Sequence, residues 1–202
     1  MAVSYEQQLL ETLLPQWHSL LQGWSADGSL VAAAQEALLL NGTPQALTDL
    51  VTQWSAGDFS RIPPIVLLSS SDISSAMGAY AISTRTIYLN QDWLRTASTD
   101  QVNAVLTEEL GHYLDGLLND LDTPGDEGSL LAQVIRAGKA DTHRHVSNDS
   151  IQLQLEDGTH IAAEAYGLSQ NQNFVILSDG SALAFAANIV DSYGGISIGH
   201  NY

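Results

Sequence analysis

The sequence predicts an α+β fold, in which helical stretches and β-rich stretches follow one another along the chain. Residues 1–57 space leucines and tryptophans at helical intervals, and a further helical stretch covers residues 101–120. From residue 148 onward the apolar period changes to two, which is the period of a strand. We therefore expect an N-terminal helical region (1–57), a central core (58–147) and a C-terminal region of β-hairpins and tail (148–202).

Three helices are expected in the N-terminal region. The first contains Pro15, which predicts a kink or a break. The second has the sequence "SLVAAAQEALLL" and is followed by Asn41-Gly42, a pair that is typical of a helix end. In the third, Thr43 is placed to cap the helix and Pro44 to occupy its first position. We interpret all three as scaffold.

The central region predicts two strands and two helices. The segment "RIPPIVLL" favours a strand, and a second strand is expected around residues 86–89. The helix "QVNAVLTEELGHYLDGLLND" follows, with Thr99 or Asp100 as its cap. After the turn "LDTPGDEG", either Asp126 or Ser129 can begin the next helix. In the C-terminal region, Asp-Gly pairs at 157–158 and 179–180 predict the turns of two hairpins.

Composition excludes several classes of function. The 202 residues carry 6 Lys plus Arg against 23 Asp plus Glu, a formal net charge of −17, which would repel a nucleic-acid backbone. There is no cysteine, so any metal must be held by His, carboxylates, carbonyls or water. No apolar run has the length of a membrane span, and the N-terminus lacks the features of a standard signal peptide.

The stretch "VLTEELGHYLDGLLND" places Glu108, His112 and Asp115 on one face of its helix, opposite an apolar face. A polar stripe is ordinary for a surface helix, but like charges without basic partners are unfavourable. Gly111 and Gly116 cost about 1 kcal/mol each relative to alanine in a helix interior. A helix that accepts both penalties is a candidate for holding a ligand.

The segment "EELGH" resembles the zincin signature H-E-x-x-H, with Glu108 in place of the first histidine. This resemblance implies that His112 is a metal ligand and that Glu109 is the general base. The segments "GDFSRIPPIVLL", "GAYAISTRTIYLNQDWL" and "DTPGDEG" also resemble a peptidase-like domain of large secreted bacterial proteins that carry hemolysin-type calcium-binding repeats. The likeness spans roughly residues 55–165, although the G-G-x-G-x-D repeats themselves do not occur in this sequence.

In one group of zincins the third ligand is a glutamate on the next helix. By that resemblance Glu127, which lies 15 residues after His112, is the expected third ligand. Asp126 is a competitor for this role, or a helix cap. Asp115, one turn beyond His112, is either a partner that orients the imidazole or a solvated helix residue.

Zinc accepts carboxylate oxygen as well as imidazole nitrogen, so it is the expected metal. Replacing a neutral histidine by the anionic Glu108 lowers the charge of the site by one unit, which leaves a bound water less acidic. Oxygen-rich ligation also admits manganese, iron or calcium. Separately, Asp120 and Asp122 occupy the first and third positions of an EF-hand-like loop, but Pro124 and Leu131 cannot ligate through side chains. A looser calcium site is the remaining interpretation.

These observations predict a metal-dependent hydrolase that cleaves a peptide or protein substrate with a metal-activated water. The strand around residues 86–89 would bind an extended substrate by strand addition. The alternative is a non-catalytic pseudo-peptidase or cation-binding module of a secreted system, with a C-terminal tail that is processed. The resemblance implies a secreted or cell-surface location, and the cytoplasm is the alternative.

Overall fold

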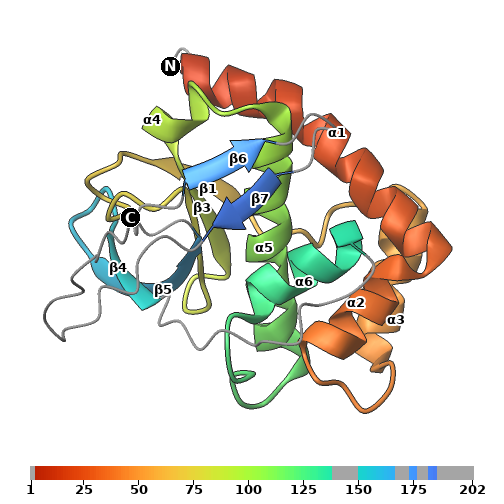
Figure 1. Ribbon diagram of the computed structural model, residues 1–202. Coiled ribbons are helices and arrows are strands. Elements are labelled where there is room, and N and C mark those ends of the chain that lie inside the picture. The colour runs from red at the N-terminus through yellow and green to blue at the C-terminus, as the bar shows by residue number, and fades with distance from the viewer. Residues whose placement is uncertain (1–2, 138–149, 167–172, 177–181, 186–202) are drawn as a thin grey trace, which may run out of the picture. The chain divides into compact units, whose positions relative to one another are not determined.

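The computed structural model describes residues 3–137, 150–166, 173–176 and 182–185. The chain divides into two compact units, Met1–Leu168 and Ser169–Tyr202. Helices and a mixed five-stranded sheet make up the first unit, which confirms the predicted α+β class (Figure 1). The unit extends past the boundary that the sequence suggested at residue 148, because the first predicted hairpin belongs to the same sheet as the central strands.

The three predicted N-terminal helices are α1 (Tyr5–Asp27), α2 (Ser29–Ala37) and α3 (Gln45–Ser55). Pro15 does not break α1. Pro15 and the residue one turn before it are exposed, so water can bond to the carbonyl that loses its helical partner. The predicted cap of α3 is wrong, because the Thr43 hydroxyl accepts a hydrogen bond from Gln35 and the helix begins after Pro44.

The sheet has the strand order β1-β3-β2-β5-β4. Its strands are β1 (Ile65–Leu68), β2 (Gly78–Ala81), β3 (Thr86–Asn90), β4 (Ser150–Gln154) and β5 (His160–Tyr166). Strand β3 runs parallel to β1 and antiparallel to β2, so both of its edges are already paired. The expectation that residues 86–89 add a substrate strand is therefore wrong, since strand addition requires a free edge.

Alternation along the strands separates two faces of the sheet. Tyr80 of β2 and Leu89 of β3 pack with the helices, whereas Ala79 and Ala163 belong to a second apolar cluster. Because successive side chains of a strand point to opposite faces, Glu164 of β5 lies on the helix side of the sheet. The pairing of β5 with β2 thus brings a carboxylate from the first predicted hairpin to the helices.

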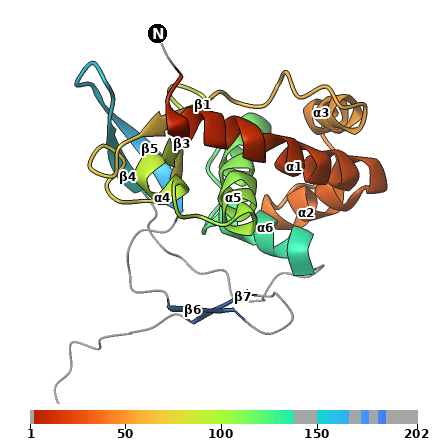
Figure 2. The same cartoon turned by 90° about the horizontal axis from the view of Figure 1, so that it is seen from above.

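Helix α5 (Thr99–Leu118) carries the EELGH segment and lies between the sheet and helices α2 and α3 (Figure 2). Its cap is Ser98, which forms a capping box with Gln101, so the predicted caps at Thr99 or Asp100 were one or two residues late. The short helix α4 (Gln91–Leu94) precedes it. Helix α6 (Glu127–Ala137) follows, and the Asp126 carboxylate accepts the Ser129 N–H at 2.7 Å, which confirms Asp126 as a helix cap.

Helices α5 and α6 cross at two glycines. A Cβ placed on Gly111 would lie 2.6 Å from the Cα of Gly128. Because this neighbour is backbone, the two helices would have to separate to admit even a methyl group. The glycine that sequence analysis counted as a cost to the helix is therefore required by its packing.

We expect Gly111→Ala to destabilise the protein by about 2 kcal/mol, since overpacking outweighs the gain in helix propensity. Gly23→Ala is the matched control, because Gly23 lies inside α1 with no atom within 4 Å of an added Cβ. That control should stabilise the protein by about 1 kcal/mol. Urea unfolding of both variants measures the difference, and equal effects of the two substitutions would contradict the close crossing.

The second unit contains β6 (Asn173–Ile176) and β7 (Ala182–Phe185), which pair antiparallel as the second predicted hairpin requires. Its expected turn at residues 179–180 and the tail considered for processing lie outside the described residues. Among the described helices, none combines the length and apolar character that a membrane crossing demands.

Candidate metal centre

The polar face of α5 is buried. Glu108 is 3 % exposed, Glu109 is not exposed at all and His112 is 1 % exposed. Helix α6 and strand β5 both pack against α5, which removes these side chains from water. Burying several ionisable groups on one helix is costly unless they are hydrogen-bonded, protonated or bound to a cation.

The His112 imidazole is held by two carboxylates from different elements. Its Nδ1 lies 2.7 Å from Oε1 of Glu127 on α6 and 3.0 Å from Oε2 of Glu164 on β5. Burial lowers the pKa of His112, but these two carboxylates raise it more, so the pKa lies well above the ordinary value. The proton of the neutral ring therefore belongs on Nδ1, since only a protonated nitrogen can donate to a carboxylate.

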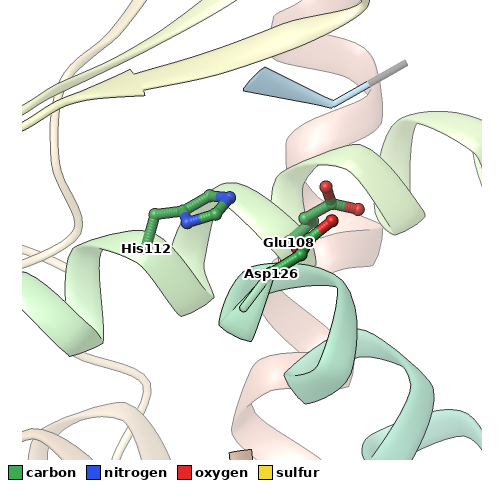
Figure 3. A group of neighbouring side chains, drawn as sticks. All are labelled: Glu108, His112 and Asp126. Atoms are coloured by element: carbon green, nitrogen blue, oxygen red, sulfur yellow. The ribbon is translucent and has the colours of Figure 1, made fainter. Parts of the chain in front are cut away.

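The other edge of the ring faces a second pair of carboxylates. Figure 3 shows a nitrogen of His112 directed toward Glu108 and Asp126, and ligand atoms of these three residues lie within 4.8 Å of one another. A Cβ on Gly128 would approach Nε2 of His112 to 2.6 Å. Gly128 thus packs directly against the ring, and a side chain at this position would collide with it.

Two further groups of ligand atoms lie within the same 4.8 Å limit: His112 with Glu127 and Glu164, and Asp115 with Asp122 and Glu127. The predicted ligands Glu108 and Glu127 therefore occur in different groups that share His112. Asp126 accompanies Glu108, whereas Glu127 contacts the opposite nitrogen of the ring. This arrangement is typical of a metal-binding histidine, whose second nitrogen donates to a carboxylate.

Glu109 is the most unusual of the buried groups. Neither of its carboxylate oxygens has a hydrogen-bond partner, and Oε1 lies 2.7 Å from where a Cβ of Gly78 would stand. Burial raises the pKa of Glu109 to about 8, and this outweighs the lowering by His112 and by the backbone N–H of Tyr166. That N–H lies near the carboxylate but outside hydrogen-bond geometry.

Asp115 has a different role from the one considered in the sequence analysis. Its carboxylate accepts hydrogen bonds from the backbone N–H and the hydroxyl of Thr123 and from the Asn119 amide. It therefore ties the end of α5 to the loop that leads into α6, and the imidazole is oriented by Glu127 and Glu164 instead.

Asp120 and Asp122, the expected calcium ligands, are both exposed at the start of this loop. Asp122 joins the group with Asp115 and Glu127, and Asp120 is in none of the three groups. Burial and the charges of Glu164 and Asp115 raise the pKa of Asp122. The carboxylates of Asp115, Asp122 and Glu164 therefore repel one another, which favours a cation near Asp122.

A cavity of about 480 Å³ adjoins His112 on the side of Glu164. The residues that line it are Tyr80, Ile82, His112, Asp115, Gly116, Asn119, Asp120, Asp122, Gly125, Ser150, Ala162, Ala163 and Glu164. The cavity opens on the Nδ1 side of the imidazole, whereas Glu108, Glu109 and Asp126 are not among its lining residues.

Glu164 is the one member of this site that the sequence analysis missed. The alternation of "HIAAEAY" indicates that Glu164 lies on the face opposite Ala163, but it does not indicate which face meets α5. That depends on the pairing of β5 with β2, which is a long-range contact.

Comparison of the chain with models of known protein families, with curated protein sequences and with solved structures finds no significant match.

Proposed function

We propose that this protein is a metal-dependent hydrolase that cleaves peptide bonds. The observation that carries the proposal is the buried face of α5, where Glu109 has no hydrogen bond and stands beside a histidine that two carboxylates orient. Burying these ionisable side chains together raises the free energy of the folded protein, and a bound cation would lower it. The zincin resemblance of "EELGH" assigns the same residues to metal binding and proton transfer.

We assign the metal to Nε2 of His112 together with the carboxylates of Glu108 and Asp126. Glu127 and Glu164 hold the Nδ1 proton and so fix the orientation of the ring. This differs from the ligand set expected from the sequence, because Glu127 contacts Nδ1 of the ring, whereas Glu108 and Asp126 form a separate group with His112.

A divalent metal would supply a Lewis acid that polarises the scissile carbonyl and acidifies water. Glu109 would act as the general base. Its pKa of about 8 keeps it protonated at neutral pH when no cation is near, and a neighbouring divalent charge lowers this pKa so that the carboxylate can accept a proton. Zinc is the expected metal, and the two carboxylate ligands also admit manganese, iron or calcium.

Peptide cleavage tests this proposal. The purified chain is incubated with a peptide library in the presence of zinc, manganese or calcium, and products are identified by mass spectrometry. We expect cleavage by the unmodified chain and none by Glu108→Ala or His112→Ala. Asp49→Asn, on the exposed surface of α3, is the matched control. Cleavage that survives both substitutions at full rate would refute the assignment.

The alternative function is a non-catalytic cation-binding module, as in a pseudo-peptidase. One observation favours it: the cavity adjoins His112 but is not lined by Glu108, Glu109 or Asp126. A substrate in that cavity would therefore reach the metal only past the imidazole. Stoichiometric metal without cleavage of any library peptide would support this function over hydrolysis.

A further inference from the structure

We propose that the cavity beside His112 binds the cationic side chain of a lysine or arginine, carried by a peptide. That this peptide is a substrate, with a basic residue next to the scissile bond, rests on the proposed function. That the cavity binds a basic side chain is argued from the residues that line the cavity.

Acidic side chains dominate the cavity. Four carboxylates line it, those of Asp115, Asp120, Asp122 and Glu164, and among the described residues that line it His112 is the one basic group, with no lysine or arginine. Asp115 is already bound to Thr123 and Asn119, whereas Asp120 and Asp122 are exposed and Glu164 keeps 35 % of its side chain accessible. Asp120 and Asp122 are therefore available to a guest that enters from solvent, and the accessible part of Glu164 can contact such a guest while it also contacts His112.

A buried phenol supplies an independent sign of a ligand. Tyr80 lines the cavity and is 3 % exposed, yet its hydroxyl makes no hydrogen bond within the described part of the chain. Its ring packs edge-on against Tyr113, with centroids 6.1 Å apart, which holds the ring in place. A phenol oxygen accepts a hydrogen bond from an ammonium or guanidinium, so Tyr80 and Glu164 together suit a cation that donates several bonds.

The remaining walls suit the aliphatic part of such a side chain. Ile82 lines the cavity and is 63 % exposed, so it offers apolar surface to a guest. Gly116 faces it closely, since an added Cβ would lie 2.8 Å from Cδ1 of Ile82. Lysine and arginine place methylene stems on apolar surface and their charge on polar groups. A volume of about 480 Å³ holds one long side chain and some adjoining backbone.

The cavity and the candidate metal centre share a wall. Glu164 lines the cavity and its Oε2 lies 3.0 Å from Nδ1 of His112. A cation bound to Glu164 is thus separated from the metal-binding nitrogen by one imidazole ring. Cleavage next to the recognised basic residue would therefore require the adjoining peptide backbone to pass the imidazole.

The test measures binding of two matched peptides by isothermal titration calorimetry. One is a blocked alanine pentapeptide with a central arginine, and the other has citrulline in its place, which is neutral and of similar shape. The full chain is used as its Glu109→Gln variant in the presence of a chelator, so that neither turnover nor metal contributes. We expect the arginine peptide to bind about tenfold more tightly than the citrulline peptide.

Asp122→Asn should reduce this preference to about twofold, and the exposed Asp49→Asn should leave it unchanged. Equal affinity for the two peptides, or a preference that survives Asp122→Asn intact, would overturn the inference. If the chain prefers the arginine peptide but binds no metal and cleaves no peptide, the proposed function is refuted and binding of a basic side chain in the cavity is supported. Cleavage without preference for a basic residue would refute only the binding of a basic side chain in the cavity.

Discussion

Glu109→Gln is expected to abolish hydrolysis and to stabilise the metal-free protein at pH 8. The catalytic effect follows because glutamine cannot accept the proton from water. The stabilising effect follows because Glu109 is fully buried without a hydrogen bond, and its ionisation in the folded protein is costly. Glutamine has nearly the same shape and carries no charge, so it removes that cost.

The pH dependence of unfolding isolates this effect. The pKa of Glu109 rises from 4.5 to about 8 on folding, so the folded state holds the proton more tightly than the unfolded state. Its contribution to stability is fully present below pH 4.5 and is lost as the pH rises through about 8, on the order of 5 kcal/mol. The charges of His112, Asp126 and Glu164 also act on this carboxylate, so the difference in stability between variant and parent is the informative quantity.

Urea unfolding in the presence of a chelator, at pH 5 and at pH 8, measures this difference. We expect the parent chain to lose more stability between the two pH values than Glu109→Gln does. Glu156→Gln, on the exposed turn between β4 and β5, is the control and should behave like the parent. An identical pH dependence in Glu109→Gln and the parent would show that Glu109 is not held as an uncharged group.

Divalent metal is expected to raise the melting temperature, and a chelator to lower it. A ligand that binds only the folded state at 100 times its dissociation constant adds about 2.7 kcal/mol of stability. For a unit of this size that corresponds to about 5–10 °C. The cause is the concentration of buried carboxylates around His112, which a cation neutralises.

Two isosteric substitutions distinguish the ligand from the positioning residue. Asp126→Asn keeps an oxygen that can cap α6 but loses the charge, so it should reduce metal affinity severely with little change in the apoprotein. Glu127→Gln should cost about tenfold in affinity, since it weakens only the hold on Nδ1. Thermal melts across a zinc titration measure both. Loss of binding in Glu127→Gln with normal binding in Asp126→Asn would assign the metal to Glu127 instead.

Local patterns predicted the helices and strands well but not their partners. The hydrophobic period of α5 and the turn before α6 are local patterns of the sequence, so both helices were expected. The burial of Glu108 and Glu109 was not, because a polar stripe on a helix says nothing about which element will cover it. Here α6 packs against it through the close approach of Gly111 and Gly128, and β2 covers Glu109 at Gly78.

The site depends on one further long-range pairing. The alternation around Glu164 predicted a strand, and the sequence assigned that strand to a separate C-terminal region. Its pairing with β2 instead brings Glu164 within 3.0 Å of His112. The residues next to His112 and Glu164 in the sequence do not indicate this contact. The resemblance predicted Glu127 as a ligand, but spacing along the chain does not show which nitrogen of the imidazole Glu127 contacts.

The most direct test of the metal centre is elemental analysis of the purified protein by inductively coupled plasma mass spectrometry, after exposure to zinc, manganese, iron and calcium in turn. We expect about one tightly bound ion per chain, retained through gel filtration and absent from Glu108→Ala and His112→Ala. Asp49→Asn should retain it. A parent chain that retains none of these metals, or variants that retain as much as the parent, would contradict a metal site on the buried face of α5.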